Sequence, residues 1–210
     1  IGSRLCDLLR GSGWEVHSAS RRATGPESAT RHRQVDFTDT EATRRLIDDT
    51  RPDHVFHLAG HVSGIPGVEH VLPAFRSNLQ TTVNLLTVLA ETGSSRFVVT
   101  GSLAEPDAAA PLDRIPSSPY AASKWASSDY VRMFHALYGF PGSVARVFMV
   151  YGPAQQDATK LVPYVIESAL RAEPPAISSG TREIDWVYVD DVAYGLALMA
   201  LADGIGGRTV

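Results

Sequence analysis

Residues 96–102 read Arg-Phe-Val-Val-Thr-Gly-Ser, and residues 119–124 read Pro-Tyr-Ala-Ala-Ser-Lys. The first stretch is a short apolar run, which is typical of a strand, and the second opens a helical pattern. This alternation of apolar runs and helical patterns recurs along the whole chain. It predicts repeated β-α units around a parallel sheet, and therefore a doubly wound α/β fold.

The alternation also gives the bounds of each element. We expect strands at Glu15–Ser20, His32–Val35, His54–Ala59, Arg96–Thr100 and Ser143–Phe148. We expect helices at Gly2–Gly11, Thr40–Arg51, Leu72–Thr92, Pro119–Tyr138, Lys160–Arg171 and Val192–Ala202. The chain opens directly on a helix, and a further strand begins near Gly206–Val210. We therefore expect a first strand before residue 1 and more chain after residue 210.

The composition is that of a globular chain. Its 210 residues are 44% hydrophobic and 20% charged, enough for one buried α/β core or a large domain with a small one. A net charge of −4 argues against nucleic-acid binding, and no apolar run approaches the roughly 20 residues that span a bilayer. The single cysteine excludes an internal disulfide, and the histidines show no metal-ligand spacing. We expect a cytoplasmic protein with no metal, membrane or nucleic-acid partner.

Tyr120 and Lys124 form the most informative pair. Lys124 is one of two lysines among 19 basic residues. A spacing of four puts both side chains on one helix face. A free phenol has a pKa of about 10, and a nearby cation lowers that value by stabilising the phenolate. The pair therefore predicts a tyrosine that transfers protons, although a solvated helix face would have the same spacing.

Further motifs follow the predicted strands in order. They are Gly2, Asp36-Phe37, His57-Leu58-Ala59-Gly60, Ser102 and Arg146–Pro153. With Tyr120 and Lys124, they resemble the extended short-chain dehydrogenase/reductase family, also called the NAD-dependent epimerase/dehydratase family, whose members mostly act on nucleotide sugars. The resemblance covers nearly the whole chain. It implies a Rossmann domain at residues 1–150 and, at residues 151–210, the start of a small, partly missing substrate-binding part interleaved with the last Rossmann elements.

The resemblance implies a bound nicotinamide dinucleotide. Gly2 corresponds to the last glycine of the family's phosphate-binding turn, where helix N–H groups hold the pyrophosphate. The Asp36-Phe37 pair resembles the one that contacts adenine. The other implied cofactor contacts are Leu58, Ala59, Gly60, Val147, Tyr120 and Lys124.

Arg21 and Arg22 follow a predicted strand, where an NAD-specific relative usually carries an acidic residue for the ribose hydroxyls. Two guanidinium groups suit a 2′-phosphate instead. The pair favours NADP(H) over NAD(H), although an ordinary solvated turn would also carry two arginines.

The family's catalytic roles fall on Ser102, Tyr120 and Lys124. The resemblance implies that Ser102 hydrogen-bonds the substrate oxygen and that Tyr120 exchanges a proton with it. It implies that Lys124 lowers the pKa of Tyr120 and binds the ribose, while the nicotinamide carries the hydride.

The residues after Ser102 separate the reactions within the family. Related 4,6-dehydratases place an Asp-Glu or Ser-Glu pair directly after the catalytic residue, whereas this chain reads Leu103-Ala104-Glu105. The late glutamate disfavours dehydration and is closer to some 4-ketoreductases of deoxysugar pathways. A glutamate in a loop is otherwise usually solvated.

Three further positions are expected at the substrate. Met149 stands where relatives often carry an asparagine that meets the substrate diphosphate. Lys160 and Arg182 match segments that lie against the nucleotide or neutralise its phosphates, although Arg182 falls two residues early. Asp191 and Val192 are expected to cap and begin a helix.

The sequence therefore favours reduction of a 4-keto-6-deoxy sugar nucleotide with NADP(H). One alternative is a 4-epimerase that retains its NAD. Another is a non-catalytic nucleotide-binding or interaction domain that kept the fold. The family resemblance also implies a homodimer formed through two long helices.

Overall fold

The computed structural model describes residues 1–93, 95–106, 113–155, 157–177, 180–181 and 183–210. At its centre, β3 (His54–His57), β4 (Arg96–Ser102) and β5 (Gly142–Val147) form a parallel sheet in that order. A second parallel pair joins β1 (His17–Ser20) to β2 (Arg31–Gln34). Because the strands within each sheet run the same way, their carboxyl ends, where the candidate site residues follow, meet at one edge of the sheet.

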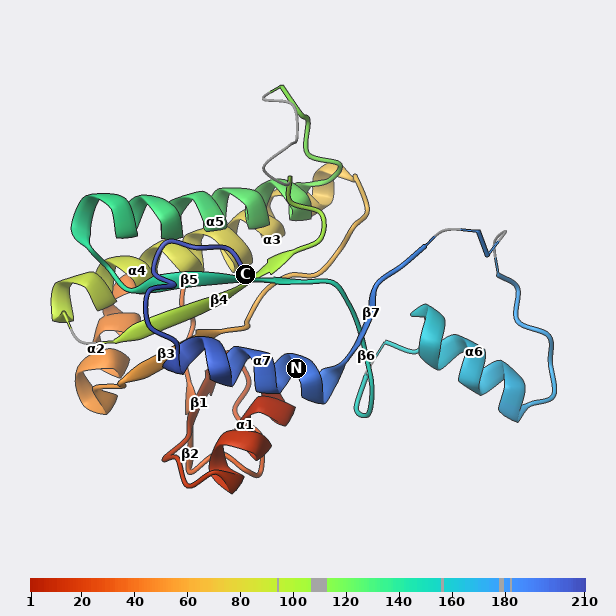
Figure 1. Cartoon of the computed structure of the whole chain (residues 1–210), viewed down its shortest axis with the longest axis horizontal. Helices are drawn as coiled ribbons and strands as arrows, with labels where there is room; N and C mark the ends of the chain where they lie inside the picture. Colours follow the sequence, from red (N-terminus) through yellow and green to blue (C-terminus); the bar gives the residue numbers. More distant parts are fainter. Residues whose placement is uncertain (94, 107–112, 156, 178–179, 182) are drawn as a thin grey trace.

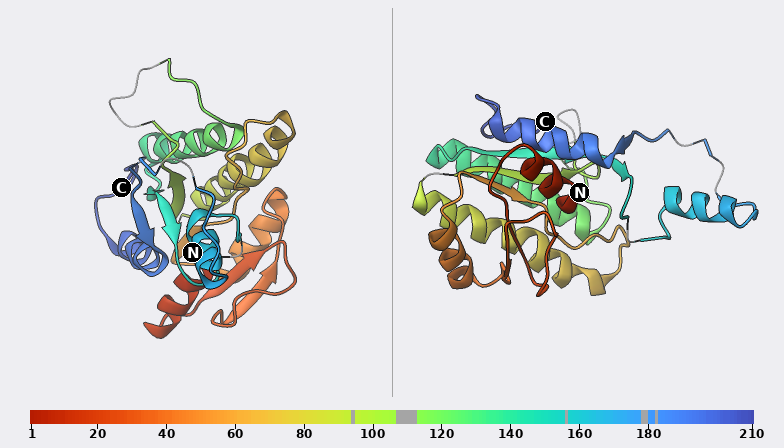
Figure 2. Two further views of the ribbon diagram at one scale, coloured as in Figure 1. Left: turned by 90° about the vertical axis from the view of Figure 1, so that its right-hand side faces the viewer. Right: turned by 90° about the horizontal axis from the view of Figure 1, so that it is seen from below.

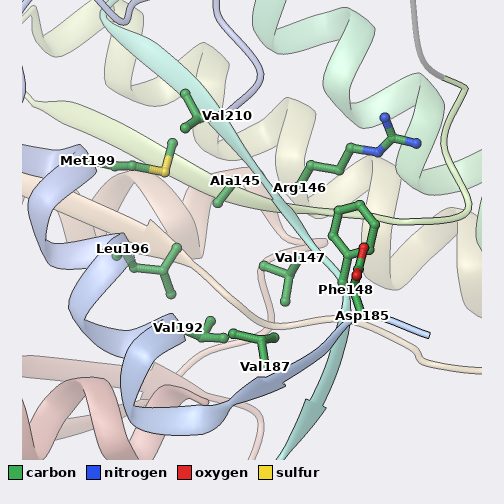
Figure 3. A pocket seen from close by; sticks show the side chains of 11 residues that line it. Ala145, Arg146, Val147, Phe148, Asp185, Val187, Val192, Leu196, Met199 and Val210 are labelled. Atoms are coloured by element: carbon green, nitrogen blue, oxygen red, sulfur yellow. The ribbon is translucent and has the colours of Figure 1, made fainter. Parts of the chain in front are cut away.

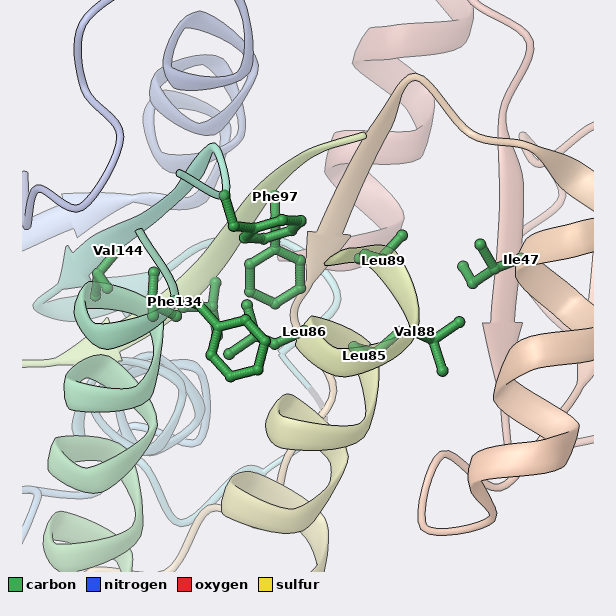
Figure 4. Close-up of a cluster of buried hydrophobic side chains, with 11 residues drawn as sticks. Ile47, Leu85, Leu86, Val88, Leu89, Phe97, Phe134 and Val144 are labelled. Carbon is green, nitrogen blue, oxygen red and sulfur yellow. The ribbon is translucent and has the colours of Figure 1, made fainter. Parts of the chain in front are cut away.

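Helices cover both faces of the central sheet, as Figures 1 and 2 show. Alternate residues of β4 serve the two faces, since Phe97 and Val99 belong to one buried cluster and Val98 to the other. Figure 4 shows the first cluster, which α2 (Thr40–Thr50), α4 (Thr81–Thr92) and α5 (Pro119–Tyr138) cover. A strand buried on both faces is characteristic of a parallel sheet with helices on each side.

The opposite face is covered by α1 (Gly2–Gly11) and α7 (Val189–Leu201). Leu5 and Leu9 of α1 pack in the same buried cluster as Leu196 of α7. The two helices are also joined by Arg4, whose Nε and Nη2 donate to the carboxylate of Asp190 at 2.6 and 2.8 Å. The doubly wound α/β fold that the sequence predicts is confirmed.

The segment from β6 to β7 extends away from this body (Figure 1). In it, β6 (Met149–Tyr151) pairs in parallel with β7 (Trp186–Tyr188), and α6 (Leu161–Leu170) lies between them in the chain. After α7 the chain returns to the outer side of β5, where Thr209 forms a parallel bridge with Val144. The strand expected near Gly206–Val210 is thus seen as a short pairing.

The structure differs from the sequence prediction in three places. The helix expected at Leu72–Thr92 is divided, because a π-helical turn, η2 (Phe75–Gln80), separates α3 (Val71–Ala74) from α4. The pair β6–β7 was not predicted, since each strand has only 3 residues. The expected cap at Asp191 is wrong, because Tyr188 is the N-cap of α7 and Asp191 lies within the first turn.

Candidate active site

The start of α5 fixes the positions of Tyr120 and Lys124. The Ser118 side chain caps the helix by accepting from the backbone N–H of Ala121 at 3.2 Å, and Pro119 occupies the first turn, where it is tolerated. At the other end, Gly139 adopts a φ of +67° that terminates the helix. The helix therefore begins one residue before Tyr120, with a geometry set by its own sequence.

Ser102 is the last residue of β4 and is buried, with 7% of its surface exposed. Its hydroxyl accepts from the N–H of Ala104 at 3.2 Å, which leaves the hydroxyl proton free to point elsewhere. Ser102 lies close enough to Tyr120 for its hydroxyl to affect the pKa of the phenol. The structure thus brings together the serine and the tyrosine that the sequence places 18 residues apart.

Lys124 is almost fully buried, with 7% of its surface exposed. Its Nζ donates to the backbone carbonyl of Thr100 at 2.8 Å. Burial lowers the pKa of Lys124 to about 8, against an opposing effect of the Glu105 charge. A lysine held this way is cationic at neutral pH and close to its titration point.

The expected effect of Lys124 on Tyr120 is not seen. Burial raises the pKa of Tyr120, the Ser102 hydroxyl opposes this, and the charge of Glu105 adds to it. The net direction is opposite to that predicted from the Tyr-x-x-x-Lys spacing. The reason is that desolvation disfavours the phenolate more than the nearby groups stabilise it.

Asn78 is a site residue that the sequence analysis missed. It lies in the π-helical turn η2 and is 1% exposed. Its side chain accepts from the His61 N–H at 2.7 Å and donates to the His61 carbonyl at 3.1 Å and to Ser123 Oγ at 2.8 Å. A π-helical turn is frequent at functional sites, but its only sequence signal is a polar residue inside an apolar helix pattern.

Gly60 completes this contact between the end of β3 and α5. A Cβ at Gly60 would lie 2.7 Å from Asn78 Oδ1 and 3.9 Å from Lys124 Nζ. Only glycine fits so close to the asparagine amide. The expected cofactor residue Gly60 therefore lies beside the lysine.

Glu105 is the second residue that the sequence analysis undervalued. A glutamate in a loop is usually solvated, yet this one is 4% exposed. Its Oε1 accepts from the backbone N–H of Ser102 at 2.6 Å. Burial raises the pKa of Glu105, and the nearby Ser128 hydroxyl, the hydrogen bond from the Ser102 N–H and the charges of Lys124 and Arg132 oppose this.

His57 ends β3, the strand next to β4. It is 4% exposed, and its Nε2 lies 3.2 Å from Thr81 Oγ1. Burial lowers the pKa of His57 to about 3, and the positive charge of Lys124 acts in the same direction. His57 is therefore neutral under physiological conditions, so it supports the site by packing and hydrogen bonding and carries no charge there.

The expected cofactor residues outside this cluster include the start of a helix and an exposed arginine pair. Gly2 begins α1 without a side-chain cap, and Leu58 Cδ1 lies 3.8 Å from where a Gly2 Cβ would be. Arg21 and Arg22 are exposed after β1, and the Arg21 charge contributes to the low pKa of Asp36, which is caused mainly by hydrogen bonds from Thr38. Unpaired N–H groups at a helix start suit the diphosphate of a dinucleotide. Exposed guanidinium groups suit a phosphate on its ribose.

Phe37 and Ala59 lie near the same strand ends. Phe37 is partly buried, with its ring centroid 6.4 Å from that of His57, and Ala59 is exposed. The residues present at these strand ends therefore fit a nicotinamide dinucleotide, which would be held by α1, the ends of β1 and β3 and the start of α5.

Val147 is the register partner of Ser102 on β5, and its carbonyl accepts from the Leu103 N–H at 3.2 Å. It lines an apolar pocket of about 320 Å³ between β5, β7 and α7, shown in Figure 3, together with Phe148, Val187 and Leu196. The residues that line this pocket do not include Ser102, Tyr120 or Lys124. We therefore place the chemistry at the buried polar cluster, because its groups can donate and accept protons and the apolar pocket offers few that can.

Two of the expected substrate residues, Met149 and Lys160, lie on the extended segment. Met149 begins β6, paired in register with Trp186. Lys160 is exposed at the start of α6, with Nζ 3.7 Å from Asp157 Oδ2. Arg182 lies outside the described residues. The structure brings neither Met149 nor Lys160 into a hydrogen bond or ion pair with Ser102, Tyr120 or Lys124.

Membrane-spanning helices and metal clusters are both absent from the described part of the chain. No helix there is long and apolar enough to cross a membrane. Among the same residues, no group of three or more histidine, cysteine or acidic side chains is arranged to hold a metal ion.

Comparisons with known proteins find relatives that are named as nucleotide-sugar enzymes. The chain is 32% identical over 201 residues to dTDP-glucose 4,6-dehydratase of Salmonella typhimurium, covering 83% of this chain and 55% of the relative. It is 29% identical over 170 residues to UDP-glucuronate 4-epimerase of Thermodesulfobacterium geofontis, covering 77% and 52%. The solved UDP-glucose 4-epimerase complex with NAD from Thermus thermophilus superposes with a TM-score of 0.76 at 28% identity, covering 99% of this chain and 72% of that one.

The chain spans about half the length of the curated relatives it matches. The family model described as the NAD dependent epimerase/dehydratase family matches residues 1–209. That match covers the helix start, the strand ends and the buried cluster described above. This chain therefore belongs to the NAD-dependent epimerase/dehydratase family.

Proposed function

We propose that the protein containing this chain is a nicotinamide-dependent oxidoreductase of nucleotide sugars, and specifically a 4-ketoreductase of a 4-keto-6-deoxy sugar nucleotide. The observation that carries the proposal is the convergence of Ser102, Tyr120 and Lys124 at the end of β4 and the start of α5. These are a hydroxyl, a phenol and a cation, which is what protonation of a carbonyl oxygen requires.

In this proposal each side chain has a defined task. Ser102 donates a hydrogen bond to the substrate carbonyl oxygen and orients it. Tyr120 gives that oxygen a proton as it gains negative charge, and its high pKa keeps the proton on the phenol at neutral pH. Lys124 supplies positive charge beside the oxygen. A bound reduced nicotinamide would supply the hydride.

The position of Glu105 favours reduction over dehydration. Elimination of water needs an acid or base that reaches the sugar. Here Leu103 and Ala104 carry no such group, and the Glu105 carboxylate is turned inward onto the Ser102 N–H at 2.6 Å. The carboxylate nearest to Ser102 in the sequence is therefore buried within the site and is not presented to a substrate.

The proposal includes NADP(H) as the preferred cofactor. Its support is the exposed pair Arg21 and Arg22 at the end of β1, where a 2′-phosphate would lie in a Rossmann fold. The neighbouring Asp36 carboxylate interacts with Arg21, so part of the pair's charge is already balanced.

The experiment uses the full-length protein with NADPH and a 4-keto-6-deoxy sugar nucleotide. Loss of the near-ultraviolet absorbance of the reduced nicotinamide, dependent on the sugar nucleotide, is the expected result. Tyr120→Phe serves as the inactive control, because it keeps the ring and removes the proton. Absence of oxidation in the wild-type protein would overturn the reductase assignment.

A 4-epimerase is the second candidate, and the epimerases among the similar proteins favour it. The same three side chains would remove and return a proton at one oxygen. Purified protein that already carries nicotinamide, and that interconverts two 4-epimers without added cofactor, would support this candidate. If the protein showed no activity and bound no cofactor, these results would instead favour a non-catalytic domain.

We also propose that the protein is a cytoplasmic homodimer that binds a nucleotide sugar. Support comes from exposed apolar side chains on α5, where Tyr130 and Leu137 are 39% and 67% exposed. Light scattering of the full-length protein would measure its oligomeric state, and a monomer at micromolar concentration would contradict the dimer.

A further inference from the structure

The turn after β4 carries a carboxylate that the proposed proton transfer does not use. Glu105 closes this turn, because its N–H donates to the Ser102 carbonyl at 3.0 Å while its Oε1 accepts from the Ser102 N–H at 2.6 Å. The two residues are thus bound to each other in both directions. A glutamate that is 4% exposed is unusual unless it has a specific charge partner or hydrogen-bond donor.

The backbone is shaped to admit this carboxylate. A Cβ at Gly101 would lie 2.7 Å from Glu105 Oε1 and 2.9 Å from Val144 Cγ1. Since both distances are shorter than real side chains tolerate, glycine at position 101 keeps open the space that the carboxylate occupies.

The charged and titratable groups around Glu105 come from two elements. From α5 these are Tyr120, Lys124 and Arg132, which interact with it electrostatically. From β5 the guanidinium of Arg146 donates to the Glu105 backbone carbonyl. Among the described residues, none of the ion pairs within 4 Å includes Glu105, and its charge acts on Lys124 from beyond that distance.

We propose that Glu105 is a positioning residue that fixes the Ser102 backbone and provides the buried negative charge facing Lys124. A negative charge at this position favours the ammonium form of Lys124 and the protonated form of Tyr120. Both are the forms that a proton donor with a cationic neighbour requires. The link from this charge to turnover rests on the proposed function, whereas the link to the titration of Lys124 does not.

The first test is an NMR titration of Lys124 without substrate. Lys124 and Lys160 are the two lysines of this chain, so Lys160→Arg assigns the Lys124 signal within it. Glu105→Gln keeps an oxygen that can accept from the Ser102 N–H but removes the charge. We expect it to lower the Lys124 midpoint by about one pH unit, whereas Glu105→Asp, which keeps the charge, should lower it less.

A matched control is Glu91→Gln, which removes an exposed charge bound to Arg44 on α2. It should leave the Lys124 midpoint unchanged. If Glu105→Gln folds and also leaves the midpoint unchanged, the proposal is overturned, whatever reaction the protein catalyses.

A second measurement needs no variant. The side-chain carbon shift of Glu105 in the wild-type protein should report a carboxylate at pH 7. Because burial raises the pKa of Glu105, a neutral carboxyl group at that pH is the competing state, and its observation would overturn the proposal even if Glu105→Gln failed to fold.

Turnover provides the final readout. Since Glu105→Gln should lower the pKa of Tyr120 as well, we expect the alkaline limb of kcat for ketone reduction to move to lower pH, with little change in KM. A uniform loss of activity with an unchanged pH profile would indicate a purely structural role and contradict the proposal.

Discussion

The inner and outer parts of the site are built on different principles. Inside, Lys124, Asn78 and Glu105 are each less than 10% exposed and are held by short hydrogen bonds to backbone groups. Outside, Arg21 and Arg22 are exposed, and the Arg21 charge acts on the Asp36 carboxylate at the surface. Changes to the inner part should therefore affect rate and stability, and changes to the outer part should affect affinity and selectivity alone.

The largest expected effect is at Tyr120. Tyr120→Phe should reduce turnover by at least about a hundredfold, because it removes the proton that the oxygen receives, while cofactor affinity stays nearly constant. Steady-state kinetics and a cofactor titration measure the two quantities. Tyr130→Phe on the exposed side of the same helix is the control and should retain full activity. Near-normal turnover in Tyr120→Phe would show that Tyr120 is not the proton donor.

Asn78→Ala should show how much the inner part contributes to stability. It leaves both backbone groups of His61 and the Ser123 hydroxyl without their partner, so we expect a loss of about 2 kcal/mol in the free energy of unfolding. Asn84→Ala is the matched control on α4. Asn84 donates to the carbonyls of Phe37 and Thr38 and is partly exposed, so urea unfolding should show a smaller loss. Equal losses would contradict the distinction.

Lys124→Met should stabilise the protein at neutral pH while abolishing activity. The folded pKa of Lys124, about 8, is below its ordinary value of 10.5, so the buried charge destabilises the fold fully below pH 8. This cost disappears as the pH rises from about 8 to 10.5. We expect Lys124→Met to gain about 1–2 kcal/mol at pH 7, and less at higher pH.

Lys160→Met provides the comparison for that gain. Lys160 is the other lysine of this chain and lies at the surface, with 51% of its side chain exposed and Nζ 3.7 Å from Asp157 Oδ2. Thermal unfolding of both variants between pH 7 and 10 should show a gain that depends on pH for Lys124→Met alone. A destabilised Lys124→Met would mean that the bond to the Thr100 carbonyl outweighs the cost of burying the charge.

The smallest expected effect is at the outer part of the site, at Arg21 and Arg22. Replacing Arg21 and Arg22 together with alanine should weaken NADPH about tenfold and leave NADH within about twofold, because only NADPH carries the 2′-phosphate that the guanidinium groups would bind. Unfolding stability should not change. Equal losses for the two cofactors would show that the pair is ordinary surface charge.

The sequence predicted the fold well because the strands of the central sheet and the long helices have strong local patterns. It placed β4 and α5 within two residues of their observed bounds, since apolar periodicity and a proline at the start of a helical pattern are local signals. The family resemblance also predicted that Ser102 and Tyr120 act together, from their positions in the chain alone.

The sequence did not predict what burial does to these residues. Asn78 lies in a stretch whose pattern is that of one continuous helix, and its side chain meets residues 61 and 123 only in the folded chain. In the sequence Glu105 has the features of an ordinary loop glutamate, and only the structure shows that the space left by Gly101 holds its carboxylate. The same burial reverses the expected pKa shift of Tyr120, because desolvation depends on the surrounding fold and not on the spacing to Lys124.

The short pairing of residues 208–210 with β5 bears on aggregation. Val144 N–H donates to the Arg208 carbonyl at 2.9 Å, and Val210 N–H donates to the Val144 carbonyl at 2.9 Å. In the strand order β3-β4-β5, β5 is the edge strand. The bonds to residues 208–210 cover that edge and make β5 an inner strand. A chain that lacked residues 205–210 would expose a row of unpaired backbone groups on a largely buried strand, and we expect such a chain to associate with copies of itself.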